Sequence, residues 1–337
     1  MSPRNLVLLL GVLLVSGCET VSYYSQAICG QLGLMNAARP VDQWLADPAT
    51  PPELRGRLQV ARSIREFASE RLGLPSNGSY SSYADLGRPY VVWNVYAAPR
   101  FSVEPKQECF PFTGCVSYRG FFSEEDARRL AARLREEGND VYLGGVPAYS
   151  TLGWFDDPLL STFIQYPDVQ LARLVFHELA HQRVYVKGDT TFNESFAVTV
   201  EEEGVKRWLE AAGRSSELEA MRAARQRRQQ FASRVAQTRE RLAEVYREKL
   251  PEEAMLERKR EEYAKLRAEY HNLVPAEPNN AYLVSIALYT QLVPQFEALL
   301  GACGGDLKAF YESAEAIAAR PREARSTLTS AECRQSS

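Results

Sequence analysis

The stretch LARLVFHELAHQ, residues 171–182, decides how this chain folds, together with FNESFA at residues 192–197. Apolar residues recur in the first stretch at three- and four-residue spacing, which predicts a helix. In such a helix His177 and His181 project from one face, so both imidazoles can bind one zinc ion. Glu178 then lies about 100 degrees further round the helix, where its carboxylate can take a proton from the attacking water.

Glu194 is the candidate for the third protein ligand that a catalytic zinc ion requires. It follows His181 by thirteen positions, and the Gly-Asp pair at residues 188–189 predicts a turn that brings a second helix back onto the first. Taken singly, a buried histidine or a glutamate near a helix start more often has a structural role. Two supporting residues are also predicted. Asn193 precedes the ligand, and Glu201 lies on the same helix face as Glu194, where it can hydrogen-bond a ligand histidine or remain solvated.

The segments HELAHQ (177–182) and NESFA (193–197) resemble zinc aminopeptidases whose third ligand is a glutamate carried by a similar Asn-Glu-Gly-Phe-Ala segment. The present chain has a shorter interval between histidine and glutamate, and Ser195 stands where those proteins have glycine. Together with a lipoprotein leader, STLGWFDD (150–157) and NNA (279–281), the motif resembles more closely a bacterial family of predicted aminopeptidases found as envelope lipoproteins. This resemblance spans most of the mature chain. It implies an α+β, mostly helical fold with a thermolysin-like pair of ligand-bearing helices.

The N-terminus is typical of an exported bacterial lipoprotein. A basic region precedes a ten-residue apolar run, residues 6–15, which is too short to span a bilayer as a mature helix. VSGC at residues 15–18 matches the lipobox, in which Cys18 is acylated after cleavage; an ordinary secretory signal is the alternative. We therefore expect a signal peptide over residues 1–17 and a membrane anchor at Cys18. Glu19 favours the outer membrane of a Gram-negative envelope, facing the periplasm.

The overall composition is that of an ordinary globular protein, with 45% hydrophobic and 25% charged residues. A formal net charge of -3 predicts no nucleic-acid partner, and we expect a monomer that acts on peptides. An exported protein can form disulfides. Cys109 and Cys115 flank a short turn-rich loop and are the best pair, Cys303 with Cys333 would tie down the C-terminal tail, and Cys29 is expected to be unpaired and buried.

The rest of the chain divides by its periodicity. Helical spacing predicts an N-terminal helical segment over residues 18–75. Runs of β-branched and aromatic residues between 76 and 153 predict a small, mainly antiparallel sheet with one covering helix. The peptidase core is expected to cover residues 76–213. A long helical hairpin follows over residues 214–274, and C-terminal helices over residues 275–337 complete the core.

Substrate contacts are predicted outside the two motif helices. In glutamate-liganded zinc peptidases an edge strand lies over the metal and binds the substrate backbone, and residues 146–153 have the corresponding place in the chain. Asp156 or Asp157 could bind a free amine, or only cap the next segment. Tyr282 is the candidate for stabilising the oxyanion, with His271 second, although a core role is common for a tyrosine. The predicted substrate-binding set is Tyr149, Ser150, Thr151, Gly153, Asp156, Asn279 and Asn280.

The sequence thus predicts a zinc metallopeptidase, expected to be an aminopeptidase, with one Zn²⁺ per chain bound by His177, His181 and Glu194 and with Glu178 as the base. Two alternatives stay open. One is an endopeptidase of the same chemistry, which would also cut N-acetylated peptides. The other is a non-catalytic envelope chaperone or assembly lipoprotein, whose structural zinc would have a fourth protein ligand.

Overall fold

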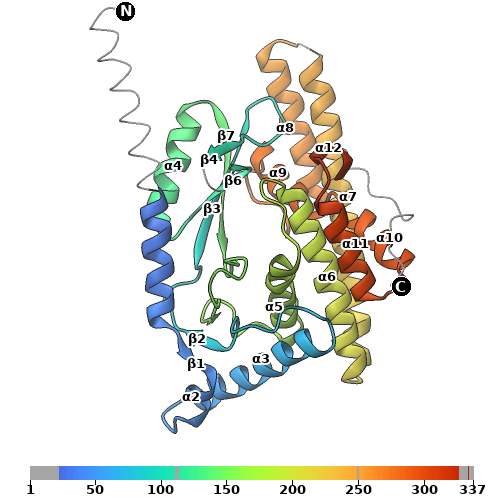
Figure 1. Cartoon of the computed structure of the whole chain (residues 1–337). Coiled ribbons are helices and arrows are strands. Elements are labelled where there is room, and N and C mark those ends of the chain that lie inside the picture. The colour runs from blue at the N-terminus through green and yellow to red at the C-terminus, as the bar shows by residue number, and fades with distance from the viewer. Residues whose placement is uncertain (1–22, 111–113, 249, 326–332, 334–337) are drawn as a thin grey trace, which may run out of the picture.

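The computed structural model describes residues 23–110, 114–248, 250–325 and 333. The predicted signal peptide and Cys18 lie outside these residues. Helices form most of the described chain and short strands the remainder, as expected for an α+β fold (Figure 1).

The N-terminal part is helical except for one short strand. Residues 23–37 form a helix, followed by β1 (Arg39–Pro40), α2 (Val41–Ala46) and α3 (Pro52–Glu70). A proline suits the first turn of α3 because its missing N–H has no helical partner there. The strand β1, which the sequence pattern did not predict, interrupts this helical segment and pairs with β2 (Ser82–Ala84). The buried face of α3 consists of Leu58, Ala61, Ile64, Arg65 and Ala68.

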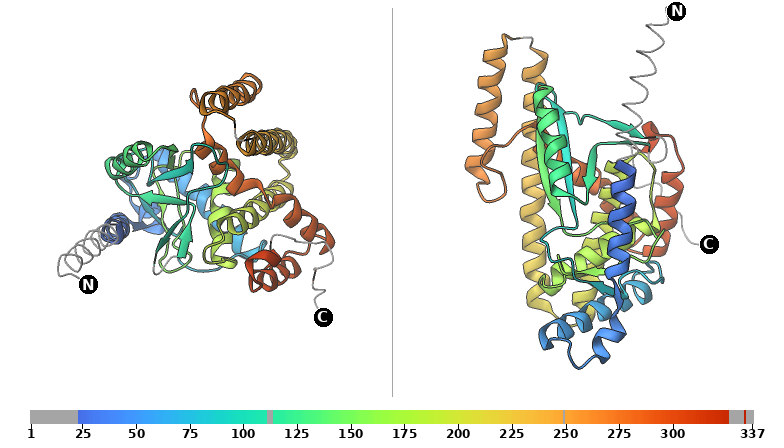
Figure 2. Two further views of the ribbon diagram at one scale, coloured as in Figure 1. Left: turned by 90° about the horizontal axis from the view of Figure 1, so that it is seen from above. Right: turned by 90° about the vertical axis from the view of Figure 1, so that its left-hand side faces the viewer.

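The larger sheet is antiparallel, as predicted, and lies between two helical layers. Its central strand β3 (Val92–Pro99) pairs with β6 (Tyr118–Phe121) on one side and β7 (Asn139–Val146) on the other. One face of β3 packs against α4 (Glu124–Glu136), and the other packs against α9 (Asn280–Thr290). Figure 2 shows this sheet between α4, in green, and the orange C-terminal helices.

The described residues contain further strands beyond this sheet, so the prediction of a single sheet is wrong. β2 pairs with β1 and, in parallel, with β8 (Leu159–Leu160). β4 (Glu108–Phe110) pairs with β5 (Gly114–Val116), and a disulfide between Cys109 and Cys115 joins them.

The helices α5 (Asp168–Arg183) and α6 (Thr190–Ala211) lie side by side in the middle of the fold (Figure 1). The short connection between them is closed by Asn193, whose side chain accepts a hydrogen bond from the Val186 amide (2.7 Å) and donates one to the Val186 carbonyl (2.8 Å). Gly204 lets α6 approach its neighbours closely. A Cβ atom there would lie only 2.8 Å from side-chain atoms of both Leu72 and Phe176.

The C-terminal half is helical. Its elements are α7 (Ser215–Arg247), α8 (Glu252–Glu269), α9, α10 (Val293–Ala302), α11 (Leu307–Ala318) and α12 (Arg322–Arg325). By length and composition the stretch Asn280–Ala302 could cross a membrane. In the structure it is divided between α9 and α10, which pack on α6 and the sheet, and core helices often have this composition. Cys303 pairs with Cys333 as predicted, whereas Cys29 is free and exposed rather than buried.

Candidate metal centre

Two imidazoles and one carboxylate converge between α5 and α6. The Nε2 atom of His177 lies 3.2 Å from Nε2 of His181 and 3.2 Å from Oε2 of Glu194, and the third pair, His181 Nε2 and Glu194 Oε2, is 3.6 Å apart. Ligand atoms about 2.0–2.2 Å from a tetrahedral zinc ion are about 3.3–3.6 Å apart. The donor types and their spacing are therefore close to those of a tetrahedral divalent metal site.

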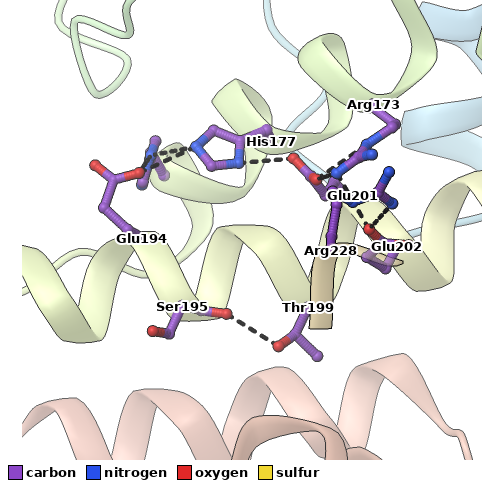
Figure 3. A network of polar contacts seen from close by, with 9 residues as sticks. Arg173, His177, Glu194, Ser195, Thr199, Glu201, Glu202 and Arg228 are labelled. Carbon is purple, nitrogen blue, oxygen red and sulfur yellow. Dashed lines mark hydrogen bonds and ion pairs between the residues drawn. The ribbon is translucent and has the colours of Figure 1, made fainter. Parts of the chain in front are cut away.

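Local structure explains why the three ligands meet. Four-residue spacing puts both histidines on the same face of α5, and the Asn193 clamp fixes where α6 turns back. Glu194 therefore comes from the second turn of α6 and points toward His177 (Figure 3). His181 and Glu194 are buried, so little water competes for the ion.

A chain of charged groups continues behind His177. Its Nδ1 atom lies 2.9 Å from Oε2 of Glu201, whose other oxygen accepts hydrogen bonds from Arg173. Arg173 also lies 3.1 Å from Glu202, which accepts a hydrogen bond from Arg228 (2.6 Å; Figure 3). A carboxylate behind a metal-binding imidazole fixes the ring and its tautomer and makes the ring a stronger ligand.

The electrostatics of the cluster favour a cation. Burial raises the pKa of Glu194, but the nearby His181 and His177 outweigh it and lower the pKa to about 2, so the carboxylate is ionised. Burial lowers the pKa of His177, but hydrogen bonds to Glu194 and Glu201 raise it well above its usual value. Burial also raises the pKa of Glu178, with the two imidazoles opposing it. A glutamate with a raised pKa suits the uptake and release of a proton.

Three tyrosines that sequence reasoning missed surround these carboxylates. Tyr118 on β6 and Tyr289 on α9 both have a pKa well above the usual value, because of burial and then the charge of Glu194. Tyr80 is only 2% exposed, has a positive φ of 64°, and interacts electrostatically with Glu178. The chain has seventeen tyrosines and no spacing rule for them, so the sequence offered no signal for Tyr118 or Tyr80.

A family model described as "putative aminopeptidase" matches residues 22–328. The chain belongs to this family. No curated protein and no solved structure gives a match. Family membership agrees with the peptidase activity predicted from the sequence. The family description names neither a metal nor its ligands, so the geometry of the cluster is the evidence for a metal site in this aminopeptidase-family chain.

The role predicted for Tyr282 in this aminopeptidase-family chain is wrong. Its hydroxyl donates a hydrogen bond to the Leu273 carbonyl (2.6 Å), and its ring packs edge-on against Tyr142. Tyr282 is therefore a core residue, which was the alternative. His271, the second candidate, lies in an exposed turn after α8.

The prediction of an edge strand over the metal is also wrong. β7 ends at Val146, and residues 147–158 form an irregular loop instead of a strand. The buried Asp157 carboxylate closes the loop by accepting hydrogen bonds from the Thr151 amide (2.9 Å) and the Ser150 hydroxyl (3.4 Å). An Asp side chain that binds a backbone amide competes with strand pairing in this way.

Gly153, Asp156 and Tyr149, the other residues of this loop that were predicted to bind substrate, have different surroundings. Gly153 has φ +79°, and a Cβ atom there would lie 3.7 Å from the side chain of Gln182, the residue that follows His181. The exposed Asp156 carboxylate lies against Gly78 instead. The Tyr149 ring packs against Phe122, and its hydroxyl is buried without a hydrogen-bond partner among the described residues.

Asn279 and Asn280 hold the fold together rather than binding substrate. Asn279 caps α9 by accepting a hydrogen bond from the Tyr282 amide (3.1 Å). Asn280 is fully buried, and its side chain accepts hydrogen bonds from Tyr246 and Tyr263 and donates to the carbonyls of residues 99 and 100. With every polar atom of its side chain engaged, Asn280 is not available to a substrate.

Proposed function

We propose that the protein is a zinc-dependent aminopeptidase whose metal is held by His177, His181 and Glu194. The observation that carries this proposal is the spacing of the three ligand atoms, which matches tetrahedral zinc. Within the described part of the chain the cluster contains three ligands, the number typical of a catalytic site, whereas a structural zinc has four. This count argues against the non-catalytic alternative.

The side chains around the cluster have different roles in the proposed hydrolysis. A zinc ion bound there would polarise the scissile carbonyl and make water more acidic. Glu178 takes a proton from that water and passes it to the leaving amine. Glu201 keeps the His177 ring in place through its Nδ1 atom.

Tyr289 replaces Tyr282 as our candidate for stabilising the oxyanion. Its phenol stays protonated at neutral pH because burial and Glu194 hold its pKa well above the usual value. The phenol hydrogen-bonds Tyr96, and redirecting this bond to the negative oxygen of the tetrahedral intermediate would supply a donor worth about 2.7–4 kcal/mol. Tyr289 also lines the same cavity as His177, whereas Tyr282 does not.

We further propose that the mature protein is anchored through acylated Cys18 in the outer membrane and faces the periplasm. The lipobox supports the anchor. The two disulfides among the described residues support an oxidising compartment.

Metal analysis combined with a peptide digest tests the enzymatic proposal. We expect about one zinc ion per chain. Peptides with a free amino terminus should be shortened residue by residue, and their N-acetylated counterparts should be left intact. Internal cleavage of the acetylated peptides would instead identify an endopeptidase. A protein that neither retains zinc nor cleaves any peptide would overturn the proposal.

A further inference from the structure

The first helix of the described chain, residues 23–37, packs on the fold through a face that contains two glutamines. Gln26 accepts a hydrogen bond from the Phe122 amide (3.0 Å). Gly30 approaches the same residue so closely that a Cβ atom there would lie 2.2 Å from the Phe122 ring. Gln31 is only 8% exposed, and its side-chain amide has no hydrogen-bond partner among the described residues. These contacts fix which side of the helix faces inward.

The outward side of this helix is apolar. Ile28, Leu32 and Met35 are 58%, 50% and 37% exposed. Because successive residues of an α-helix are about 100 degrees apart, these three side chains fall within about 60 degrees of one another, and we call them the apolar stripe. Figure 1 shows the helix, in blue, at the edge of the molecule. A surface helix of a soluble protein normally has the opposite arrangement, with its polar side chains outside and its apolar ones inside.

The helix also lacks charged side chains. None occurs between Glu19 and Arg39, although charged residues make up 25% of the chain. Moving the outward face from water into lipid therefore requires no desolvation of an ion.

The apolar stripe begins close to the proposed lipid anchor. Residues 19–22 connect Cys18 to the helix, and Ile28 follows five residues after the helix begins. Even with an extended connection, Ile28 is within about 25 Å of the acylated residue. A membrane surface is therefore the partner that the anchor itself brings to the apolar stripe. Helices that lie in the plane of a membrane bury their apolar face about 5–10 Å into the boundary between headgroups and acyl chains.

We propose that residues 23–37 lie flat on the membrane surface, with Ile28, Leu32 and Met35 in the lipid boundary. This inference rests on the proposed acylation of Cys18 and adds a second membrane contact to it. Since the helix is bonded to the sheet, the contact also orients the folded domain. Acyl chains alone would leave the domain free to turn about its connection.

Cys29 provides a native labelling site for testing this inference. Its thiol is free and exposed, it lies about 60 degrees round the helix from Leu32, and the two disulfides hold the other described cysteines. The acylated protein is labelled there with an environment-sensitive fluorophore and reconstituted into vesicles of phosphatidylethanolamine and phosphatidylglycerol. We expect blue-shifted emission and protection of the label from an aqueous quencher.

The control label is placed on Arg260→Cys in a Cys29→Ser background. Arg260 lies on α8, is 72% exposed, and is away from the first helix (Figure 2). This label should stay accessible to the quencher. A Cys29 label that is quenched as strongly as the control label would overturn the inference and leave the lipid anchor intact.

Partition of the unacylated protein measures the contribution of the apolar stripe itself. The mature chain with Cys18→Ser is sedimented with the same vesicles. Adding Ile28→Ser, Leu32→Ser and Met35→Ser should lower its partition coefficient by about ten- to hundredfold, because partly exposed apolar side chains no longer enter the lipid. Binding should not depend on salt, since the helix is uncharged. Leu273→Ser is the matched control, as Leu273 is 53% exposed and lies outside this helix, and it should keep the parent value.

The inference and the proposed anchor can fail separately. Mass spectrometry of the mature N-terminus decides whether Cys18 is acylated. Binding of the unacylated chain that the three serine substitutions weaken would support the inference even if Cys18 carried no lipid. No binding, or binding that these substitutions leave unchanged, would overturn it. Self-association in solution that the substitutions abolish would also overturn it, because a second copy of the chain would then cover the apolar stripe.

Discussion

At the scale of single residues, the His177 ring is held from both sides. Glu194 faces its Nε2 atom and Glu201 its Nδ1 atom, whereas the Nδ1 atom of His181 is buried without a partner among the described residues. The two histidines are therefore not equivalent as ligands. His177 is fixed by the protein, and His181 is oriented by its helix and by the packing around it.

Replacing Glu178 by glutamine should abolish hydrolysis but leave metal binding intact, because the amide cannot take up the proton from water. General-base contributions of this kind are about 10²- to 10⁴-fold in kcat. Zinc content and peptide hydrolysis should be measured on the same preparation. His181→Ala is the comparison and should lose both properties. A Glu178→Gln variant with full activity would contradict the mechanism.

Replacing Glu201 by glutamine should weaken zinc binding by about 10- to 100-fold, because the carboxylate behind His177 no longer strengthens that ligand. Competition with a chromophoric chelator measures the affinity. Glu210→Gln is the control, since Glu210 is an exposed glutamate on the same helix. Equal zinc affinities of the two variants would show that Glu201 does not act through His177.

The convergence of His177 and His181 was predictable from the sequence because helix geometry fixes which residues share a face. The same rule explains why Tyr282 was chosen wrongly. Tyr282 and Tyr289 are seven residues apart and share a face of α9, but they lie about 10.5 Å apart along its axis. Sequence periodicity shows which face of a helix a residue lies on. It does not show which residues of the neighbouring elements lie beside it along the helix axis. That position along the axis is determined only by how α9 packs on α6 and on the sheet.

At the scale of elements, the metal centre depends on how closely α5 and α6 pack. Gly204 allows this approach, because Leu72 and Phe176 occupy the space that a side chain would need. The predicted helices and their order follow from apolar periodicity. The edge strand was predicted wrongly because the Asp157 carboxylate accepts hydrogen bonds from the Thr151 amide and the Ser150 hydroxyl. Such contacts between residues that are not adjacent in sequence leave no periodic pattern in it.

Replacing Gly204 by valine should therefore destabilise the protein, as overpacked cores typically lose about 1–3 kcal/mol. Thermal or urea unfolding measures the loss. Gly301→Ala is the control, because Gly301 is a helical glycine and a Cβ atom added to it would have no other atom within 4 Å. That change should be neutral or stabilising by up to about 1 kcal/mol. A Gly204→Val protein as stable as the wild type would show that α6 can shift without cost.

At the scale of the whole molecule, a metal ion held by the cluster would join the two central helices, and each of these helices packs against other parts of the core. α5 contacts α3, and α6 contacts α7, α9 and α10. An ion bound between them stabilises only the folded state, so its binding energy adds to the stability of the entire core.

Removing zinc should consequently lower the unfolding temperature. At free zinc concentrations of about 100 to 1,000 times Kd, the bound ion contributes about 2.7 to 4.1 kcal/mol to the free energy of unfolding. Differential scanning calorimetry with and without a chelator measures the shift. His181→Ala should show no response to either treatment. The same response in that variant would place the stabilising metal elsewhere.

The first helix of the described chain sets how far the protein could reach from a membrane. Gln26 bonds to the Gly120 carbonyl and the Phe122 amide, so this helix is fastened to the sheet. Four residues, 19–22, separate Cys18 from it. Even fully extended they span only about 14 Å. A protein acylated at Cys18 would thus have a very short linker between its lipid anchor and its folded domain. Peptides would have to diffuse to the membrane surface in order to be hydrolysed.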